Sequence, residues 1–194
     1  MDAKPNTLLD LARLRRSVRR FENRRIEPEK IAELVRVGGL AQRAFGGDDS
    51  TLLILDDPAL TEKVRAAAVS GWQGKINMWI YVTPFPAALV LVGRHTEEEA
   101  ADGRPRYLAQ AAMVMETVVL AAAEMGLGTC WMAGFNPNAV IKELGLPAGW
   151  KPIIVSPLGY LASKGKLEMV SRTVAQSDRR KPLEEIYEIR GELP

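Results

Sequence analysis

The chain has 194 residues, of which 47% are hydrophobic and 26% are charged, as is typical of a soluble globular domain. This composition argues against a disordered chain, a collagen helix and a coiled coil. The 26 basic and 24 acidic residues leave a net charge of +2, which gives no reason to expect nucleic acid or a membrane as the main partner. The lone cysteine, Cys130, and the lone histidine, His95, argue against an internal disulfide, a metal site built from Cys or His ligands, and a Ser-His-Asp triad.

The N-terminal sequence and the apolar segments indicate where the protein resides. The first five residues, Met1-Asp-Ala-Lys-Pro5, contain no apolar signal region. Glu116 and Glu124 interrupt the most apolar stretch, so no clean membrane span is expected. We therefore expect a cytoplasmic protein in a reducing compartment.

Two helices are predicted at the N-terminal end. Asn6 and Thr7 can cap a first helix that runs to about Arg16, with leucines recurring every third residue. Pro28 opens a second helix that should end at Gly38-Gly39 or shortly after. Its inward-facing residues are expected to be Ile31, Leu34 and Val35.

The middle of the chain alternates strands, a helix and loops. Residues 51–55 and 87–92 are short apolar runs and predict buried strands, with a helix from Asp57 to about Ser70 between them. The stretch 71–86 is predicted to be irregular. It is interpreted either as a lid or pocket wall or as a loop pinned by aromatic packing. Residues 95–106 are charged and loop-like.

The longest predicted helix, 106–125, is apolar on nearly all sides. Such a helix must be covered all round, which a subunit interface achieves readily. Glycines in 126–128 should end it at a left-handed cap. The remaining predicted elements are an extended segment at 129–132, a helix at 137–144 and a strand at 153–155 ending in Pro157-Leu-Gly-Tyr160. No repeat or linker divides the sequence, so a single domain over 1–194 is expected.

Three segments carry residue types suited to ligand binding. Residues 13–25 hold seven arginines and one glutamate, and their Arg15-Arg16-Ser17-Val18-Arg19 stretch suits a phosphate, because guanidinium groups bind two oxygens at once. Residues 126–135, GLGTCWMAGF, allow backbone N–H groups to approach a flat ligand. Residues 179–183, RRKPL, form a second basic cluster. For the two arginine-rich segments, the alternative interpretation is a solvated basic surface. For residues 126–135, it is a helix cap that leads into a core strand.

Taken together and in this order, the motifs resemble the FMN-dependent nitroreductase family. The pattern comprises a helix ending in RRSxR, an apolar helix leading into GLGTCW, then P-L-G-Y and a final R-[RK]-P-L-E-E. The corresponding segments of this chain are RRSVRRF (15–21), LAAAEMGLGTCWMAGF (120–135), LGLP (144–147), PLGY (157–160) and RRKPLEEI (179–186).

The resemblance implies a homodimeric α+β fold, with a central mixed or antiparallel sheet flanked by helices and FMN sites at the subunit interface. It implies that Arg15, Arg16, Ser17 and Arg19 hold the FMN phosphate, ribityl chain and N1/O2 edge. It places the backbone of Ala133 and Gly134 near flavin N5. The closing phosphate clamp is implied to be Arg180, together with Arg179 or Lys181.

The sequence departs from the family pattern after the second helix. Where the family carries A-P-S-x-x-N-x-Q-P-W, this chain has AQRAFGGDDST from 41 to 51, and Gln110 replaces an aspartate common in the long helix. Gln42, Arg43 and Phe45 are therefore expected to line the substrate pocket and make it smaller or more suited to anions. In the alternative interpretation, Arg43 points to solvent and does not affect which acceptor binds.

The leading interpretation is an oxidoreductase in which NADH or NADPH delivers hydride to FMN, and a small acceptor such as a nitroaromatic or quinone then receives the electrons. The flavin would carry the chemistry, so no catalytic side chain is required. The alternatives are a flavin-binding or storage protein with little turnover, another flavin reaction such as reductive dehalogenation or flavin destruction, and a nucleic-acid binder without flavin. Only one aromatic residue, Phe21, lies among the arginines of 13–25, which argues against the last.

Overall fold

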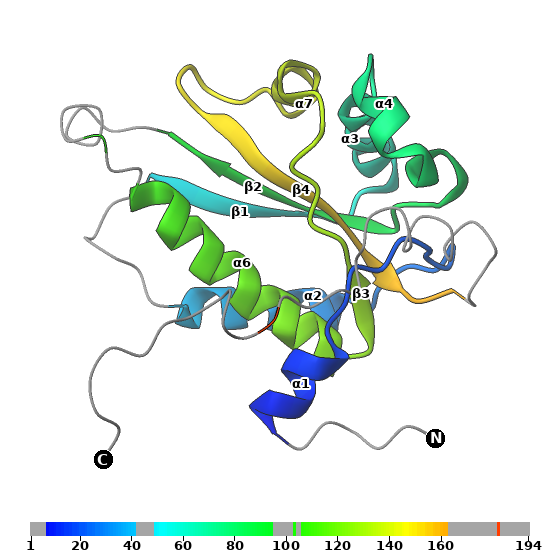
Figure 1. Cartoon of the computed structure of the whole chain (residues 1–194), viewed down its shortest axis with the longest axis vertical. Helices are drawn as coiled ribbons and strands as arrows, with labels where there is room; N and C mark the ends of the chain where they lie inside the picture. The colour runs from blue at the N-terminus through cyan, green and yellow to red at the C-terminus, as the bar shows by residue number, and fades with distance from the viewer. Residues whose placement is uncertain (1–6, 42–48, 95–102, 104–105, 163–181, 183–194) are drawn as a thin grey trace.

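The structure is a computed structural model that describes residues 7–41, 49–94, 103, 106–162 and 182. At its centre is a four-stranded sheet of order β1-β2-β4-β3, in which every neighbouring pair is antiparallel (Figure 1). The strands are β1 (Ser50–Leu55), β2 (Ala87–Gly93), β3 (Leu127–Thr129) and β4 (Lys151–Tyr160). The predicted α+β fold is confirmed.

Helices cover both faces of this sheet (Figure 1). On one face lie α2 (Pro28–Leu40) and α6 (Arg106–Glu124), and on the other lie α3 (Pro58–Ala68) and α7 (Pro137–Leu144). The shorter helices are α1 (Leu8–Leu14), α4 (Gln73–Ile76) and the 3₁₀ helix η1 (Met78–Val82).

The central strand β2 shows why two layers of helices are needed. Alternate side chains of a strand point to opposite faces of the sheet, and all seven residues of β2 are buried. Ala88, Val90 and Val92 join the core under α3 and α7. Ala87, Leu89 and Leu91 join the core under α2 and α6. Burial on both faces explains why the sequence of β2 is continuously apolar.

Several helix ends follow from local hydrogen bonds and were predicted correctly. The side chain of Thr7 accepts a hydrogen bond from a first-turn N–H of α1, and Asp57 does the same for α3 at 2.7 Å. Asn136 caps α7 in this way. Gly126 ends α6 with a φ of +75°, and Gly145 ends α7 with a φ of +59°, conformations that favour glycine.

The stretch 71–86 is not irregular as predicted, because it contains α4 and η1. Trp79 and Phe85 are buried with their rings stacked 6.4 Å apart, and this packing holds the chain in successive tight turns. For these two residues, the aromatic-packing interpretation is confirmed. Trp72 and Tyr81, in contrast, are exposed.

Three further predictions are corrected by the structure. Val35 does not face inward but is 60% exposed, because the completely buried Leu34 sets the inner face of α2 and Val35 lies about 100° around the helix. β1 is a half-buried edge strand and not a fully buried one. β4 begins at Lys151 and includes the PLGY motif, since it pairs with β2 along one side and with β3 along the other.

The predicted apolar helix is α6. Its segment Tyr107–Glu124 is long and apolar enough to cross a membrane, as judged by length and composition alone. The helix packs against α2, β1, β2 and β3, and core helices commonly meet the same criteria. Met113 and Leu108 remain more than one-third exposed on its outer side.

Candidate functional site

The arginine-rich segment after α1 lies directly beside β3. Ser17 forms a parallel bridge with Thr129, and the backbone N–H of Val18 donates to the carbonyl of Thr129 at 2.8 Å. The contact is so close that a Cβ on Gly128 would lie 2.8 Å from the Cβ of Val18. The glycine therefore allows the two motifs that the sequence singled out to lie side by side.

Arg15 and Arg16 line a cavity of about 210 Å³ beside this contact. Gly126, the residues of β3 and Leu161 also line this cavity. Arg15 is the C-terminal cap residue of α1, which fixes its backbone at the edge of the cavity. Two guanidinium groups beside small residues form a chemically suitable environment for a phosphate.

The structure adds a carboxylate to this cluster. Nε of Arg15 lies 3.5 Å from Oε1 of Glu116 on α6, with the two side chains 27% and 46% exposed. In the sequence, Glu116 is conspicuous only as an interruption of an apolar helix. A single charge in the middle of that helix was the signal that could have identified it.

Ser17 and Arg19 face Cys130, the residue after β3. Burial raises the pKa of the Cys130 thiol, while the charge of Arg19 and a hydrogen bond with Ser17 oppose the rise. The structure thus brings the predicted residues Ser17 and Arg19 together at the end of β3.

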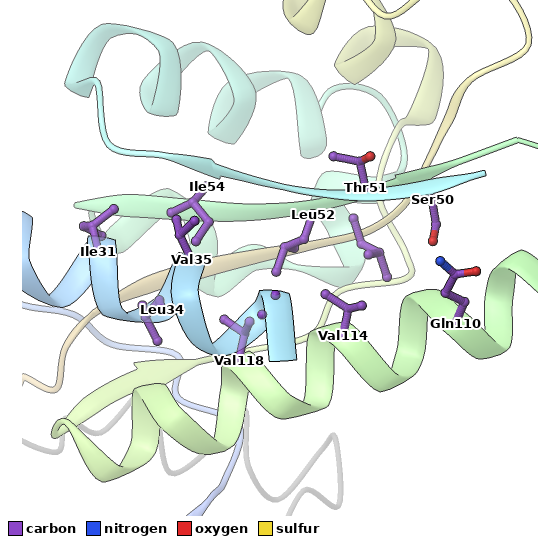
Figure 2. A pocket seen from close by; sticks show the side chains of 13 residues that line it. Ile31, Leu34, Val35, Ser50, Thr51, Leu52, Ile54, Gln110, Val114 and Val118 are labelled. Carbon is purple, nitrogen blue, oxygen red and sulfur yellow. The ribbon is translucent and has the colours of Figure 1, made fainter. Parts of the chain in front are cut away.

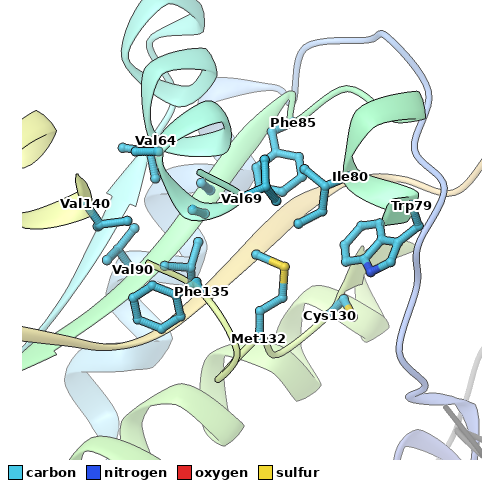
Figure 3. Close-up of a cluster of buried hydrophobic side chains, with 14 of the residues drawn as sticks. Val64, Val69, Trp79, Ile80, Phe85, Val90, Cys130, Met132, Phe135 and Val140 are labelled. Carbon is cyan, nitrogen blue, oxygen red and sulfur yellow. The ribbon is translucent and has the colours of Figure 1, made fainter. Parts of the chain in front are cut away.

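The chain after Cys130 presents its backbone at the surface. Figure 3 shows Cys130, Met132 and Phe135 directed into the core on the α3 and α7 side of the sheet. Because these side chains point inward, Ala133 is exposed and Gly134 is half-exposed. Both residues predicted to approach flavin N5 are therefore accessible to a ligand.

A residue that sequence reasoning missed holds this segment in place. The side-chain amide of Asn77, between α4 and η1, donates to the carbonyl of Gly134 at 2.6 Å. Two methyl carbons of the exposed Ile76 would lie 3.9 Å from a Cβ on Gly134. The stretch 71–86 thus borders the Ala133–Gly134 segment, which fits its interpretation as a pocket wall.

The other predicted site residues lie outside the described part of the chain. They are Gln42, Arg43, Phe45, Arg179, Arg180 and Lys181.

A larger cavity of about 380 Å³ lies between α2, β1 and α6 and shares no lining residue with the arginine cavity. Figure 2 shows Ser50 and Gln110 facing one another at one end, with aliphatic side chains along the rest. It contains no arginine, so the arginine cavity is chemically the better phosphate site. Among the side chains that the structure describes, no three His, Cys, Asp or Glu residues gather in a way that could hold a metal ion.

Comparison with known families identifies this arrangement. The sequence matches the Nitroreductase family over residues 12–160. The chain belongs to the nitroreductase family. Membership makes it a flavin-dependent oxidoreductase of this fold and confirms that part of the prediction.

Individual relatives agree with this assignment. The chain is 27% identical to an iodotyrosine deiodinase of Haliscomenobacter hydrossis over an alignment of 169 positions that covers 76% of each protein. A nitroreductase family protein from Clostridium difficile 630 superposes with a TM-score of 0.72 at 24% identity, covering 96% of this chain and 99% of that one. An FMN-dependent nitroreductase from Clostridium difficile R20291 gives 0.66 at 18% identity, covering 82% and 90%. The two structures show a shared fold.

Proposed function

We propose that this nitroreductase-family chain binds FMN, takes hydride from NADH or NADPH, and reduces a small acceptor such as a nitroaromatic or quinone. It would do so in the cytoplasm as a single domain over 1–194. The observation that carries the proposal is the pairing of Ser17 with Thr129, which sets the arginine segment beside β3.

The charge of the described arginines supports FMN binding. Arg15 and Arg16, which line the arginine cavity, would hold the phosphate there. Ser17 and Arg19 would contact the ribityl chain and the N1/O2 edge. The accessible backbone of 133–134 would approach N5. Arg179, Arg180 and Lys181 would close over the phosphate. When bound, FMN would supply the hydride-accepting and hydride-donating centre, so this chain's residues need only bind, orient and shield it.

A second candidate reaction uses the same flavin site. The likeness to an iodotyrosine deiodinase favours reductive dehalogenation of a halogenated aromatic. Parallel assays of NAD(P)H oxidation with a quinone or nitrofuran, and of halide release from an iodophenol, distinguish the two reactions. Flavin binding without turnover in either assay would indicate a storage protein, and loss of the flavin itself would indicate flavin destruction.

We also propose that the chain acts as a homodimer. In the part of the chain that the structure describes, no residue of α1 is buried, and large apolar side chains are exposed along α1, α2 and α6. They are Leu8, Leu9, Leu14, Val35, Leu40, Leu108 and Met113. A second copy would cover this surface and remove it from water. Val118 on α6 is not part of this surface, because it is completely buried within the chain itself. A charged substitution at Val118 would therefore test folding and not association.

The acceptor would meet Gln42, Arg43 and Phe45, which replace the family's A-P-S-x-x-N stretch. Arginine is longer than asparagine and always charged, so we propose a pocket that favours anionic acceptors and turns over bulky neutral nitroaromatics slowly. Arg43→Ala should then reduce activity more on an anionic acceptor than on a neutral one of similar potential. Equal losses on both would show that Arg43 selects neither.

The FMN site is tested by replacing Arg15 and Arg19 together with alanine and measuring FMN binding by quenching of flavin fluorescence. Charge-assisted contacts contribute about 1.5–3 kcal/mol each, so binding should weaken by at least about 2 kcal/mol. Arg36→Ala is the matched control, because Arg36 is an exposed arginine on α2 that pairs with Glu33. Unchanged FMN affinity in the double variant would refute the assignment.

A further inference from the structure

A carboxylate lies beside the proposed phosphate site. This is unexpected, because a carboxylate and a phosphate are both negatively charged. Oε1 of Glu116 lies 3.5 Å from Nε of Arg15, and Arg15 lines the arginine cavity. Glu116 is held at this position because α1 packs against α6, a helix of 19 residues that forms part of the core. The carboxylate therefore offsets the charge of an arginine assigned to the phosphate.

Glu116 could affect phosphate binding in two opposite ways. It could orient the guanidinium through Nε, which would strengthen binding, or it could repel the phosphate, which would weaken it. The glutamate side chain is 46% exposed, and an ion pair of that exposure contributes little to orientation. Repulsion between a carboxylate and a dianion acts over about 8–10 Å at ordinary ionic strength. Repulsion is therefore the larger of the two effects.

We propose that Glu116 is a competing carboxylate that offsets Arg15 and lowers the affinity of the site for the FMN phosphate. The consequence is a flavin that exchanges with the free pool instead of remaining permanently bound. Glu116 is thus a determinant of how strongly the site distinguishes phosphorylated from unphosphorylated flavin. The inference rests on the proposed FMN function and adds a residue that the sequence motifs do not contain.

The test measures dissociation constants of FMN and riboflavin for the full-length protein, because only FMN carries the phosphate. Glu116→Gln keeps the shape of the side chain and removes its charge. It should bind FMN about three- to tenfold more tightly at low ionic strength, with riboflavin unchanged and with the gain shrinking as salt is added. Glu116→Asp, which keeps the charge, should stay close to the wild type.

Glu143→Gln is the matched control, because it removes the same charge from an exposed position on α7, which packs against α3 and β4. It should change neither constant. Unchanged or weaker FMN binding in Glu116→Gln, or an equal gain for riboflavin, would overturn the inference while leaving the FMN site intact. Failure of the wild-type protein to bind FMN at all would overturn the proposed function itself.

Discussion

Replacing Gly128 with alanine tests whether close packing of two distant motifs forms the flavin site. The new Cβ would lie 2.8 Å from the Cβ and Cγ2 of Val18 and 2.9 Å from its Cγ1. Val18 is 4% exposed and β-branched, so its side chain cannot rotate away from the added methyl group. The backbone of residues 15–19 must therefore move away from β3.

The size of the effect follows from this geometry. Overpacking a tightly packed core destabilises a protein by about 1–3 kcal/mol. Separation of the segments would also break the hydrogen bond from the Val18 N–H to the Thr129 carbonyl, which contributes about 1 kcal/mol. We expect Gly128→Ala to lower the free energy of unfolding by about 2–4 kcal/mol. It should also weaken FMN, because Arg15 and Ser17 move with the segment.

Urea unfolding and FMN titration measure the two effects separately. Gly39→Ala is the control, because a Cβ there meets no atom within 4 Å and α2 should gain about 0.5–1 kcal/mol from the better helix former. Adding Val18→Ala to Gly128→Ala removes both Cγ contacts but not the Cβ contact, so FMN affinity should recover in part. Wild-type stability and FMN affinity in Gly128→Ala would refute the reasoning.

Three other predictions test separate parts of the molecule. Asn77→Asp cannot donate to the Gly134 carbonyl at neutral pH, so the absorption spectrum of bound FMN should shift and its affinity should fall; an unchanged spectrum and affinity would contradict the positioning role. The hydrogen bond from the Tyr160 hydroxyl lowers the pKa of Glu27 from 4.5 to about 2, with help from its backbone and Arg24. This stabilisation is present above about pH 4.5 and is lost as the pH falls toward 2. In urea unfolding, Tyr160→Phe should therefore be less stable than the wild type at pH 7. It should also lose less stability than the wild type between about pH 4.5 and pH 2. Val35→Glu should convert a dimer to a monomer in sedimentation, and a monomeric wild type at micromolar concentration would refute the dimer.

Local signals in the sequence determined much of the secondary structure. Thr7 and Asp57 were recognised as helix starts because their side chains satisfy backbone N–H groups only a few residues away. Gly126 was recognised as a helix end because the left-handed conformation there favours glycine. The run 87–92 was recognised as a buried strand because it is continuously apolar. Each of these signals depends only on residues that are close together in the sequence. The candidate site residues, in contrast, came from the order of motifs shared with a family.

The tertiary structure decided which of these segments meet. Ser17 lies beside Thr129 because the segment after α1 runs along β3. Gly128 permits this close approach, but a glycine does not specify which segment will pack against it. The contact of Glu116 with Arg15 exists because α1 packs across α6. The outward position of Val35 likewise depends on which side of α2 the sheet occupies. Such contacts depend on how complete helices and strands pack, and hydrophobic periodicity within one element specifies a face but not the element that covers it.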